Sequence, residues 1–360
     1  MLEHGGRLLE AARRHGIEPA RWLDLSTGIN PHAYPVGTIS AEAWRRLPEA
    51  EDGLIEVARR YYGIGDALAD HIAIVPIAGT QAAIQALPRV LMRGFAQRGA
   101  RSGPPGEPLR VSVATLTYNE YAHAWQRAGH AVTAHDFSRL PDAAAQSDIV
   151  MLCQPNNPTG ARLSIESLHA MLASLRSRST PHQGCLIVDE AYMDTTPGGS
   201  LLRSVNASDW AHLIVLRSVG KFFGLAGARA GFAMGSPGIM QGLNEELGPW
   251  ALSGPTRAAV SQALRDEAWQ VSTRAVLQSM AAKLDTVLHQ RLGIQATGTT
   301  LFRWFEHPRS AALHAHLASA AILVRQFATP VTGGLPSLRL GLPVDGQQLA
   351  RLDAALETFT

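Results

Sequence analysis

Residues 148–160, DIVMLCQPNNPTG, run from a stretch that is apolar after Asp148 straight into a loop rich in Pro and Asn. Residues 184–194, GCLIVDEAYMD, and 211–224, AHLIVLRSVGKFFG, repeat this plan with acids or a lysine after the apolar run. Apolar runs without alternation are typical of strands buried on both faces, so they predict a mainly parallel sheet covered by helices. Their polar ends would gather at the edge where open α/β sheets build their sites.

The alternation of strand and helix extends towards the N-terminus and changes near the C-terminus. Residues 71–91 and 109–130 each read as an apolar strand, a turn and an amphipathic helix. Long helical periodicity covers 254–292, and short strands follow near 299–306, 321–327 and 337–343. Helices grouped before strands predict a smaller α+β domain.

These changes of pattern suggest where the domains divide. We expect a large α/β domain over 39–255 and a small domain built from 1–38 together with 256–360. Residues 93–110 are rich in Gly, Pro and Arg, and we predict an exposed loop there.

Composition excludes several classes of function. The chain has 360 residues, of which 46% are hydrophobic, and 32 basic against 30 acidic side chains give a net charge of +2. We therefore expect neither nucleic acid nor a membrane as a partner. The two cysteines, Cys153 and Cys185, give no disulfide framework, which favours a reducing cytoplasm and inert buried thiols. No His, Cys or acid cluster has metal-ligand spacing, so we expect no metal.

Lys221 is the first candidate for chemistry. It follows Ser218 by three residues in SVGK, and Val219, Phe222 and Phe223 make its surroundings apolar. Desolvation favours the neutral amine that a Schiff base with an aldehyde requires. Most lysines are solvated surface residues, but this setting favours function.

Two strand ends supply further polar candidates. Asp189 ends the strand of LIVDEAYMD, where a buried carboxylate can keep a pyridinium nitrogen protonated, and Tyr192 could donate to a phenolic oxygen. The alternative is a helix cap at Asp189 with Tyr192 in the core. In QPNNPTG the prolines fix an irregular loop that can present the Asn157 amide to a ligand, although Asn-Pro turns are also common.

A phosphate site is predicted after the strand of residues 71–77. Gly79, Thr80 and Gln81 open a helix there, where free N–H groups and the helix dipole favour an anion. Arg229 in GARAG offers a fork for the same phosphate. Tyr118 in LTYNEY follows a strand and could stack on a flat ring.

The motifs NNPTG, VDEAY, S-x-x-K and LRLGL together resemble the class I/II aminotransferase superfamily of pyridoxal-phosphate enzymes. The resemblance covers nearly the whole chain. It implies pyridoxal 5′-phosphate as cofactor, an aspartate aminotransferase-like fold with a mainly parallel seven-stranded sheet sandwiched by helices, and an active site at a homodimer interface. It also implies that Arg339 in SLRLGL clamps a substrate carboxylate, although spacing alone leaves a surface arginine open.

The resemblance assigns a role to each cofactor candidate. Lys221 would bind the cofactor covalently, Asp189 would pair with its ring nitrogen, and Tyr118 would stack on the ring. Tyr192 and Asn157 would hold the phenolic oxygen, and Asn157 would contact the substrate as well. The cofactor phosphate would be bound by Gly79, Thr80, Ser218 and Arg229, with Gln81 beside them.

The N-terminal segment narrows the resemblance. EHGG at 3–6 and LDLSTGINP at 23–31 resemble the threonine-phosphate decarboxylases of cobalamin biosynthesis. In that group His4 and Arg325 would bind the substrate phosphate, and Asn30 would line the same pocket. The chain departs from its relatives at Leu47, where many have a tyrosine that reaches the neighbouring subunit, and at Arg7, where many have Asn.

This likeness implies decarboxylation of L-threonine O-3-phosphate to (R)-1-aminopropan-2-yl phosphate. The alternative is an aminotransferase of a phosphorylated amine such as histidinol phosphate. Arg339 fits both reactions, because the pose of the substrate decides which bond breaks. A third reading is a non-catalytic partner of the cobalamin bridge-forming synthase, against which the combination of Lys221, Asp189 and Arg229 argues.

Overall fold

The computed structural model describes residues 5–97, 107–177, 184–328 and 334–359. Within it the chain divides into two compact units. The larger unit comprises Tyr34–Asn157 and Arg162–Glu267, and the smaller comprises Met1–Ala33, Pro158–Ala161 and Ala268–Thr360. No helix among the described residues is long and apolar enough to cross a bilayer.

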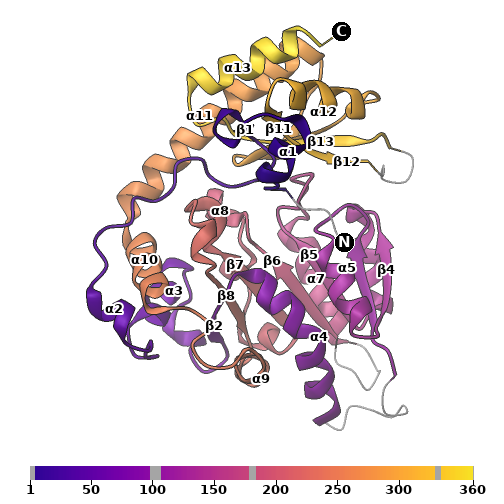
Figure 1. Ribbon diagram of the computed structural model, residues 1–360. Helices are drawn as coiled ribbons and strands as arrows, with labels where there is room; N and C mark the ends of the chain where they lie inside the picture. Colours follow the sequence, from indigo (N-terminus) through magenta and orange to yellow (C-terminus); the bar gives the residue numbers. More distant parts are fainter. Residues whose placement is uncertain (1–4, 98–106, 178–183, 329–333, 360) are drawn as a thin grey trace. The chain divides into compact units, whose positions relative to one another are not determined.

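A seven-stranded sheet forms the centre of the larger unit (Figure 1). Its order is β2-β8-β7-β6-β5-β3-β4, and only β8 runs antiparallel to its neighbours. The strands are β2 (Ala73–Ile77), β3 (Arg110–Ala114), β4 (Ala131–His135), β5 (Ile149–Cys153), β6 (Cys185–Asp189), β7 (Leu213–Ser218) and β8 (Gly231–Gly235). Every residue of β5, β6 and β7 is buried, which confirms the sheet predicted from their apolar runs.

Helices cover this sheet. The helix α4 packs against β7, β8 and α9, while α7 packs against β6 and α10 packs against α3. The helices of the unit are α2 (Ala41–Arg45), α3 (Leu54–Tyr61), α4 (Thr80–Gln97), α5 (Glu120–Arg127), α6 (Leu140–Ala143), α7 (Ile165–Arg176), α8 (Val219–Phe222), α9 (Pro237–Leu247) and α10 (Gly254–Arg265).

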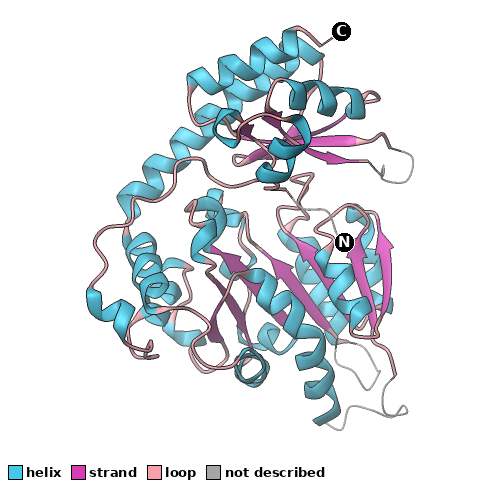
Figure 2. Cartoon of the chain, in the orientation of Figure 1, coloured by secondary structure: helices cyan, strands magenta, loops and turns pink. Residues whose placement is uncertain are grey.

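The smaller unit combines helices with two small sheets (Figure 2). One sheet has the antiparallel order β12-β13-β10-β9, and in the other β1 pairs in parallel with β11. The elements are α1 (Leu8–His15), β1 (Leu23–Asp24), α11 (Glu267–Leu292), β9 (Thr297–Thr299), β10 (Phe302–Glu306), α12 (Ser310–Ser319), β11 (Ile322–Leu323), β12 (Arg325–Phe327), β13 (Ser337–Gly341) and α13 (Gly346–Glu357).

Apolar packing ties the two ends of the chain together in the smaller unit. Ala12 and Trp22 form a buried cluster with Ala318 and Ala321. Strand β1 lies beside β11 with Leu23 opposite Ile322. The N-terminal segment therefore completes a unit whose other elements come from the last third of the chain.

The structure places two stretches differently from the sequence-based expectations. The predicted small domain began again at residue 256, but α10 belongs to the larger unit because it packs against α3 and α2. The predicted exposed loop over 93–110 is wrong at both ends, since α4 continues to Gln97 and β3 begins at Arg110. Arg89 and Arg93 both pair with Glu246 of α9, which stabilises the last turns of α4. Residues 98–106 lie outside the described part of the chain.

Candidate cofactor and substrate sites

A cavity of about 140 Å³ lies in the larger unit at the carboxyl ends of its central strands. All ten cofactor residues predicted from the sequence line it: Gly79, Thr80, Gln81, Tyr118, Asn157, Asp189, Tyr192, Ser218, Lys221 and Arg229. They come from five strand ends and the loops that follow, so the parallel strands of the sheet bring distant motifs to one place.

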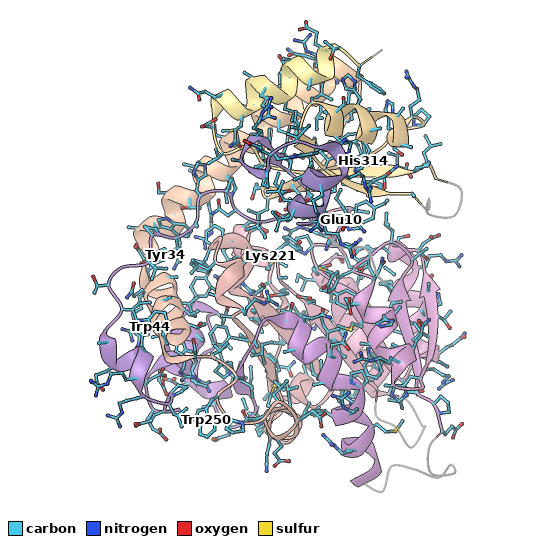
Figure 3. All side chains as sticks on the ribbon, viewed as in Figure 1. Glu10, Tyr34, Trp44, Lys221, Trp250 and His314 are labelled. Carbon is cyan, nitrogen blue, oxygen red and sulfur yellow. The ribbon has the colours of Figure 1, made fainter. Side chains whose placement is uncertain are left out.

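Lys221 lies on the short helix α8, which begins directly after β7 (Figure 3). Its side chain is half-buried, and its Nζ lies 5.6 Å from the centroid of the Tyr192 ring. The neighbouring Val219 and Phe222 are fully buried, so they anchor the helix that carries the amine. Its place in the lining of the cavity suits an amine that attacks a bound aldehyde.

Asp189 ends β6 and is only 3% exposed. Tyr121 donates its hydroxyl to Oδ2 at 2.8 Å, and the Ala191 N–H donates to Oδ1 at 3.0 Å. Burial raises the pKa of Asp189 to about 6, against the opposing effect of these two donors and of the Lys221 charge. A buried carboxylate held in this way fits a protonated ring nitrogen, which would restore the charge balance.

Close backbone packing shapes the phosphate end of the cavity. Gly79 has φ +75°, and a Cβ there would lie 3.0 Å from Nη2 of Arg229. A Cβ on Gly231 would clash with the carbonyl oxygen of Arg217 and approach the Thr80 N–H. The start of α4 and the Arg229 guanidinium therefore face the same space, and their donors and charge fit a phosphate.

Arg229 itself has a left-handed backbone with φ 50°. Such a conformation costs a residue with a Cβ about 1–2 kcal/mol, so the surrounding fold must impose it. Its Nη1 donates to the Ala226 carbonyl at 3.3 Å, which helps to aim the guanidinium.

Gln81 and Tyr118 are held to each other. The Tyr118 hydroxyl donates to Gln81 Oε1 at 3.0 Å, and Gln81 Nε2 donates to Glu120 at 2.9 Å. Burial raises the pKa of Tyr118 well above its usual value, so the phenol stays protonated. Gln81 thus serves as a support for the Tyr118 ring.

Among the lining residues that the sequence analysis did not name as site residues, two have polar side chains, Tyr121 and Cys153. Tyr121 follows Tyr118 by one helical turn, a spacing that also fits a core position and so gave no signal on its own. Cys153 is 1% exposed, its thiol donates to the Pro155 carbonyl at 3.2 Å, and burial raises its pKa well above the usual value. That protonated state agrees with an inert thiol.

Of the predicted substrate residues, Asn30, Arg325 and Arg339 lie in the smaller unit, and Asn157 lies in the larger one. Arg325 on β12 and Arg339 on β13 are direct partners in the antiparallel register, so both side chains project from one face of the sheet. Arg339 is 6% exposed and donates to the Ser26 carbonyl at 2.8 Å. Asn30 is buried and accepts the His32 N–H at 2.8 Å, and His4 lies outside the described residues.

A second cavity, of about 220 Å³, lies within the smaller unit. Its lining is rich in basic side chains, with Arg7, Arg14, His15, His314 and Arg325, while Glu10 supplies a carboxylate that pairs with Arg7 and Arg14 (Figure 3). Burial lowers the pKa of His314, and the neighbouring positive charges lower it further. An anion would relieve this crowding of charge.

The two N-terminal motifs meet at this cavity. Gly6 donates its N–H to Ser26 Oγ at 2.8 Å, and a Cβ on Gly5 would clash with the Ser26 carbonyl. The paired glycines of EHGG therefore allow close contact with the LDLS segment. The described residues contain no group of three or more His, Cys, Asp or Glu side chains that could hold a metal ion.

Comparison with known proteins identifies the family. The model of the family "Aminotransferase class I and II" matches residues 44–356. The chain belongs to the class I and II aminotransferase family. This confirms the resemblance drawn from NNPTG, VDEAY, S-x-x-K and LRLGL.

Three proteins are similar to the chain along nearly its whole length. A threonine-phosphate decarboxylase of Pseudomonas aeruginosa is 45% identical over 100% of the chain and 98% of its own length. One from Sinorhizobium sp is 37% identical, covering 99% of the chain and 97% of its own length. The structure of a histidinol-phosphate aminotransferase from Sinorhizobium meliloti, solved with pyridoxal 5′-phosphate, has a TM-score of 0.75 at 18% identity and covers 99% and 97% of the two chains. This structural similarity confirms the aspartate aminotransferase-like fold predicted from the sequence.

Proposed function

We propose that the chain is a pyridoxal-phosphate enzyme that decarboxylates L-threonine O-3-phosphate to (R)-1-aminopropan-2-yl phosphate in cobalamin biosynthesis. The observation that carries this proposal is the pairing of Arg325 with Arg339 across two adjacent strands. Like charges placed opposite each other destabilise a sheet, so anions on that face would offset the cost. Threonine phosphate brings two anions, a carboxylate and a phosphate. Relatives of that name at 45% and 37% identity support the same substrate.

The residues around the larger unit's cavity would bind the cofactor. Lys221 would hold its aldehyde carbon, and the Asp189 carboxylate would keep its ring nitrogen protonated. Tyr192 and Asn157 would hold the phenolic oxygen, and Tyr118 would pack on the ring. Gly79, Thr80, Ser218 and Arg229 would bind the phosphate. When bound, the cofactor supplies a ring that accepts the electron pair of the breaking bond.

The remaining residues orient the substrate and move a proton. Arg339 holds the carboxylate, and Arg325, His4 and Asn30 hold the phosphate; for His4 this rests on the resemblance alone. Binding the remote phosphate supplies orientation, so the Cα–carboxylate bond rather than the Cα–H bond is the one aligned to break. Carbon dioxide would leave, and Lys221 in its ammonium form would donate a proton to the α carbon in place of the lost carboxylate.

An aminotransferase of a phosphorylated amine, such as histidinol phosphate, is the alternative. Arg339 favours it equally, because an aminotransferase uses the same arginine for the carboxylate of its amino donor or acceptor. Only the transaminase needs 2-oxoglutarate. A non-catalytic partner of the bridge-forming synthase remains a weaker proposal, because such a role gives no reason to keep Lys221 and Asp189 together in one cavity.

Carbon dioxide release tests the proposal directly. Purified protein loaded with cofactor is expected to release carbon dioxide from threonine phosphate without added 2-oxoglutarate. Lys221→Ala should lower the rate at least about a hundredfold, because it removes both the covalent anchor and the proton donor. Turnover that depends on 2-oxoglutarate, with no gas released, would favour the aminotransferase instead.

We also propose that the protein acts as a homodimer in a reducing cytoplasm. Trp44, Leu47 and Trp250 are 70%, 62% and 57% exposed. Figure 3 shows the two tryptophans on the larger unit. Beside them lies an apolar groove of about 620 Å³ lined by Pro48, Ile55 and Trp250 among others. Exposed aromatic side chains beside a groove are typical of protein contact surfaces, and the family resemblance suggests a second copy as the occupant. Cys153 and Cys185 are both free and buried, which agrees with that compartment.

A further inference from the structure

Tyr121 is a buried aromatic residue in the first turn of α5, and the cofactor contacts assigned above give it no role. It is 1% exposed and lines the cofactor cavity. Its hydroxyl donates to Asp189 Oδ2 at 2.8 Å. A buried hydroxyl on a carboxylate makes a charge-assisted hydrogen bond, which is stronger than one between neutral groups.

The contact bridges elements that are not neighbours in the sheet. Tyr121 follows β3, Asp189 ends β6, and β5 lies between these two strands. Asp189 Oδ1 already accepts the Ala191 N–H from its own loop. Tyr121 therefore supplies the second fixed point, and a carboxylate held at both oxygens cannot rotate about its Cβ–Cγ bond.

The surroundings of Tyr121 fix its own position. Its ring lies edge-on to Tyr118 with centroids 5.5 Å apart, and Cys153 lies beside its hydroxyl. Burial raises the pKa of the Tyr121 hydroxyl far above its usual value, so it remains a donor across the working pH range. The donor is thus locked in place by packing.

The charges that face Asp189 come from several elements. Glu190, which follows β6, raises the pKa of Asp189, while Lys221 of α8 lowers it. Cys153 of β5 and Tyr118 before α5 stay protonated because burial raises their pKa values. Among the groups that oppose the effect of burial, the Tyr121 hydrogen bond has the largest influence.

We propose that Tyr121 is a positioning residue that fixes the Asp189 carboxylate towards the ring nitrogen of the cofactor. The inference rests on the cofactor assignment of the proposed function but not on the identity of the substrate. Tyr121 need not touch the cofactor; it acts through Asp189. In its absence the carboxylate would be held at one oxygen, and its ionised form would lose its strongest side-chain donor.

The test is binding of pyridoxal 5′-phosphate to the cofactor-free full chain of Tyr121→Phe, which keeps the ring and deletes the donor. We expect about a tenfold weaker dissociation constant, the size of one lost hydrogen bond to a charged group. The acid limb of the affinity–pH curve should move to higher pH, because loss of a donor to the carboxylate raises its pKa. With substrate, kcat should fall while KM stays near that of the wild type.

Two further variants keep the test specific. Tyr34→Phe deletes another tyrosine-to-carboxylate hydrogen bond of the same unit, to Asp266 at 3.3 Å (Figure 3), and should leave cofactor affinity unchanged. Tyr121→His restores an N–H donor and should recover part of the affinity. If Tyr121→Phe keeps both the wild-type dissociation constant and the wild-type acid limb, the proposal is wrong, even if the variant melts earlier. A missing carbon dioxide signal with threonine phosphate would instead contradict the substrate assignment, because cofactor binding is measured without substrate.

Discussion

Burying the ionised Asp189 carboxylate lowers the stability of the cofactor-free protein, and bound cofactor would offset this loss. Burial raises its pKa in the folded protein to about 6 from the usual 3.8. A carboxyl group with a raised folded pKa contributes stability that is complete below the unfolded value and is lost as pH rises through the folded value. The cofactor-free protein should therefore be destabilised by this group above about pH 6.

We predict that Asp189→Asn makes the cofactor-free protein more stable at pH 8, by about 1–3 kcal/mol. The advantage should shrink at pH 5, where the wild-type carboxyl is largely protonated. Thermal unfolding of both proteins at the two pH values checks this. Cofactor affinity should fall in the same variant, because an amide cannot neutralise a protonated ring. A variant less stable than wild type at pH 8 would contradict the prediction.

The sequence could predict which residues would meet in the cavity of the larger unit, because they lie where strands of the sheet end. Asn157, Asp189 and Lys221 could each be placed from an apolar run followed by polar letters. Tyr121 could not, because a tyrosine inside an amphipathic helix is read as core until its partner is known. Its partner lies 68 residues away on another element, which only the fold reveals.

Strands β12 and β13 carry Arg325 and Arg339, so we expect the pairing of these strands to determine the preference for the substrate. We predict that Arg325→Gln raises KM for threonine phosphate about 10- to 100-fold, the size of a lost charge-assisted contact to phosphate. KM for unphosphorylated threonine should change little. Steady-state kinetics with the two amino acids measures the ratio.

Arg303 on β10 of the same sheet is the matched control. Its guanidinium is paired with Asp285 at 2.6 and 2.9 Å, so Arg303→Gln should alter stability without altering the preference between the two amino acids. An equal rise of both KM values in Arg325→Gln would show that the arginine does not read the phosphate.

The sequence predicted which segments form strands and helices, but it did not predict which strands pair with each other. Apolar runs predicted the strands of the larger sheet, but nothing local indicates that β2 pairs antiparallel with β8 or that β1 pairs with β11. The periodicity over 254–292 read as continuous, whereas Asp266 separates two helices there. Likewise, Arg89 and Arg93 near the end of α4 pair with Glu246 of α9, a contact between two helices that the local sequence does not indicate.

At the scale of the whole molecule, the exposed tryptophans predict assembly. Wild-type protein should run at twice the chain mass of 38.6 kDa in light scattering, and Trp44→Glu combined with Trp250→Glu should give the monomer mass. Burying a charge at an apolar contact is costly, which is the reason for dissociation. Val271→Glu, which changes a residue 67% exposed on α11, should leave the mass unchanged. A monomeric wild type would contradict the homodimer.

The pairing of β1 with β11 also affects the order in which the two units can fold during synthesis on the ribosome. A ribosome makes residues 23–24 early, yet their partner strand does not exist until residue 322 has been added. By then the whole sheet from β2 to β8 has been synthesised and can fold first. A chain that ends after β8 and before β12 therefore carries every predicted cofactor residue but neither Arg325 nor Arg339. Such a fragment would lack both arginines that we expect to hold the substrate.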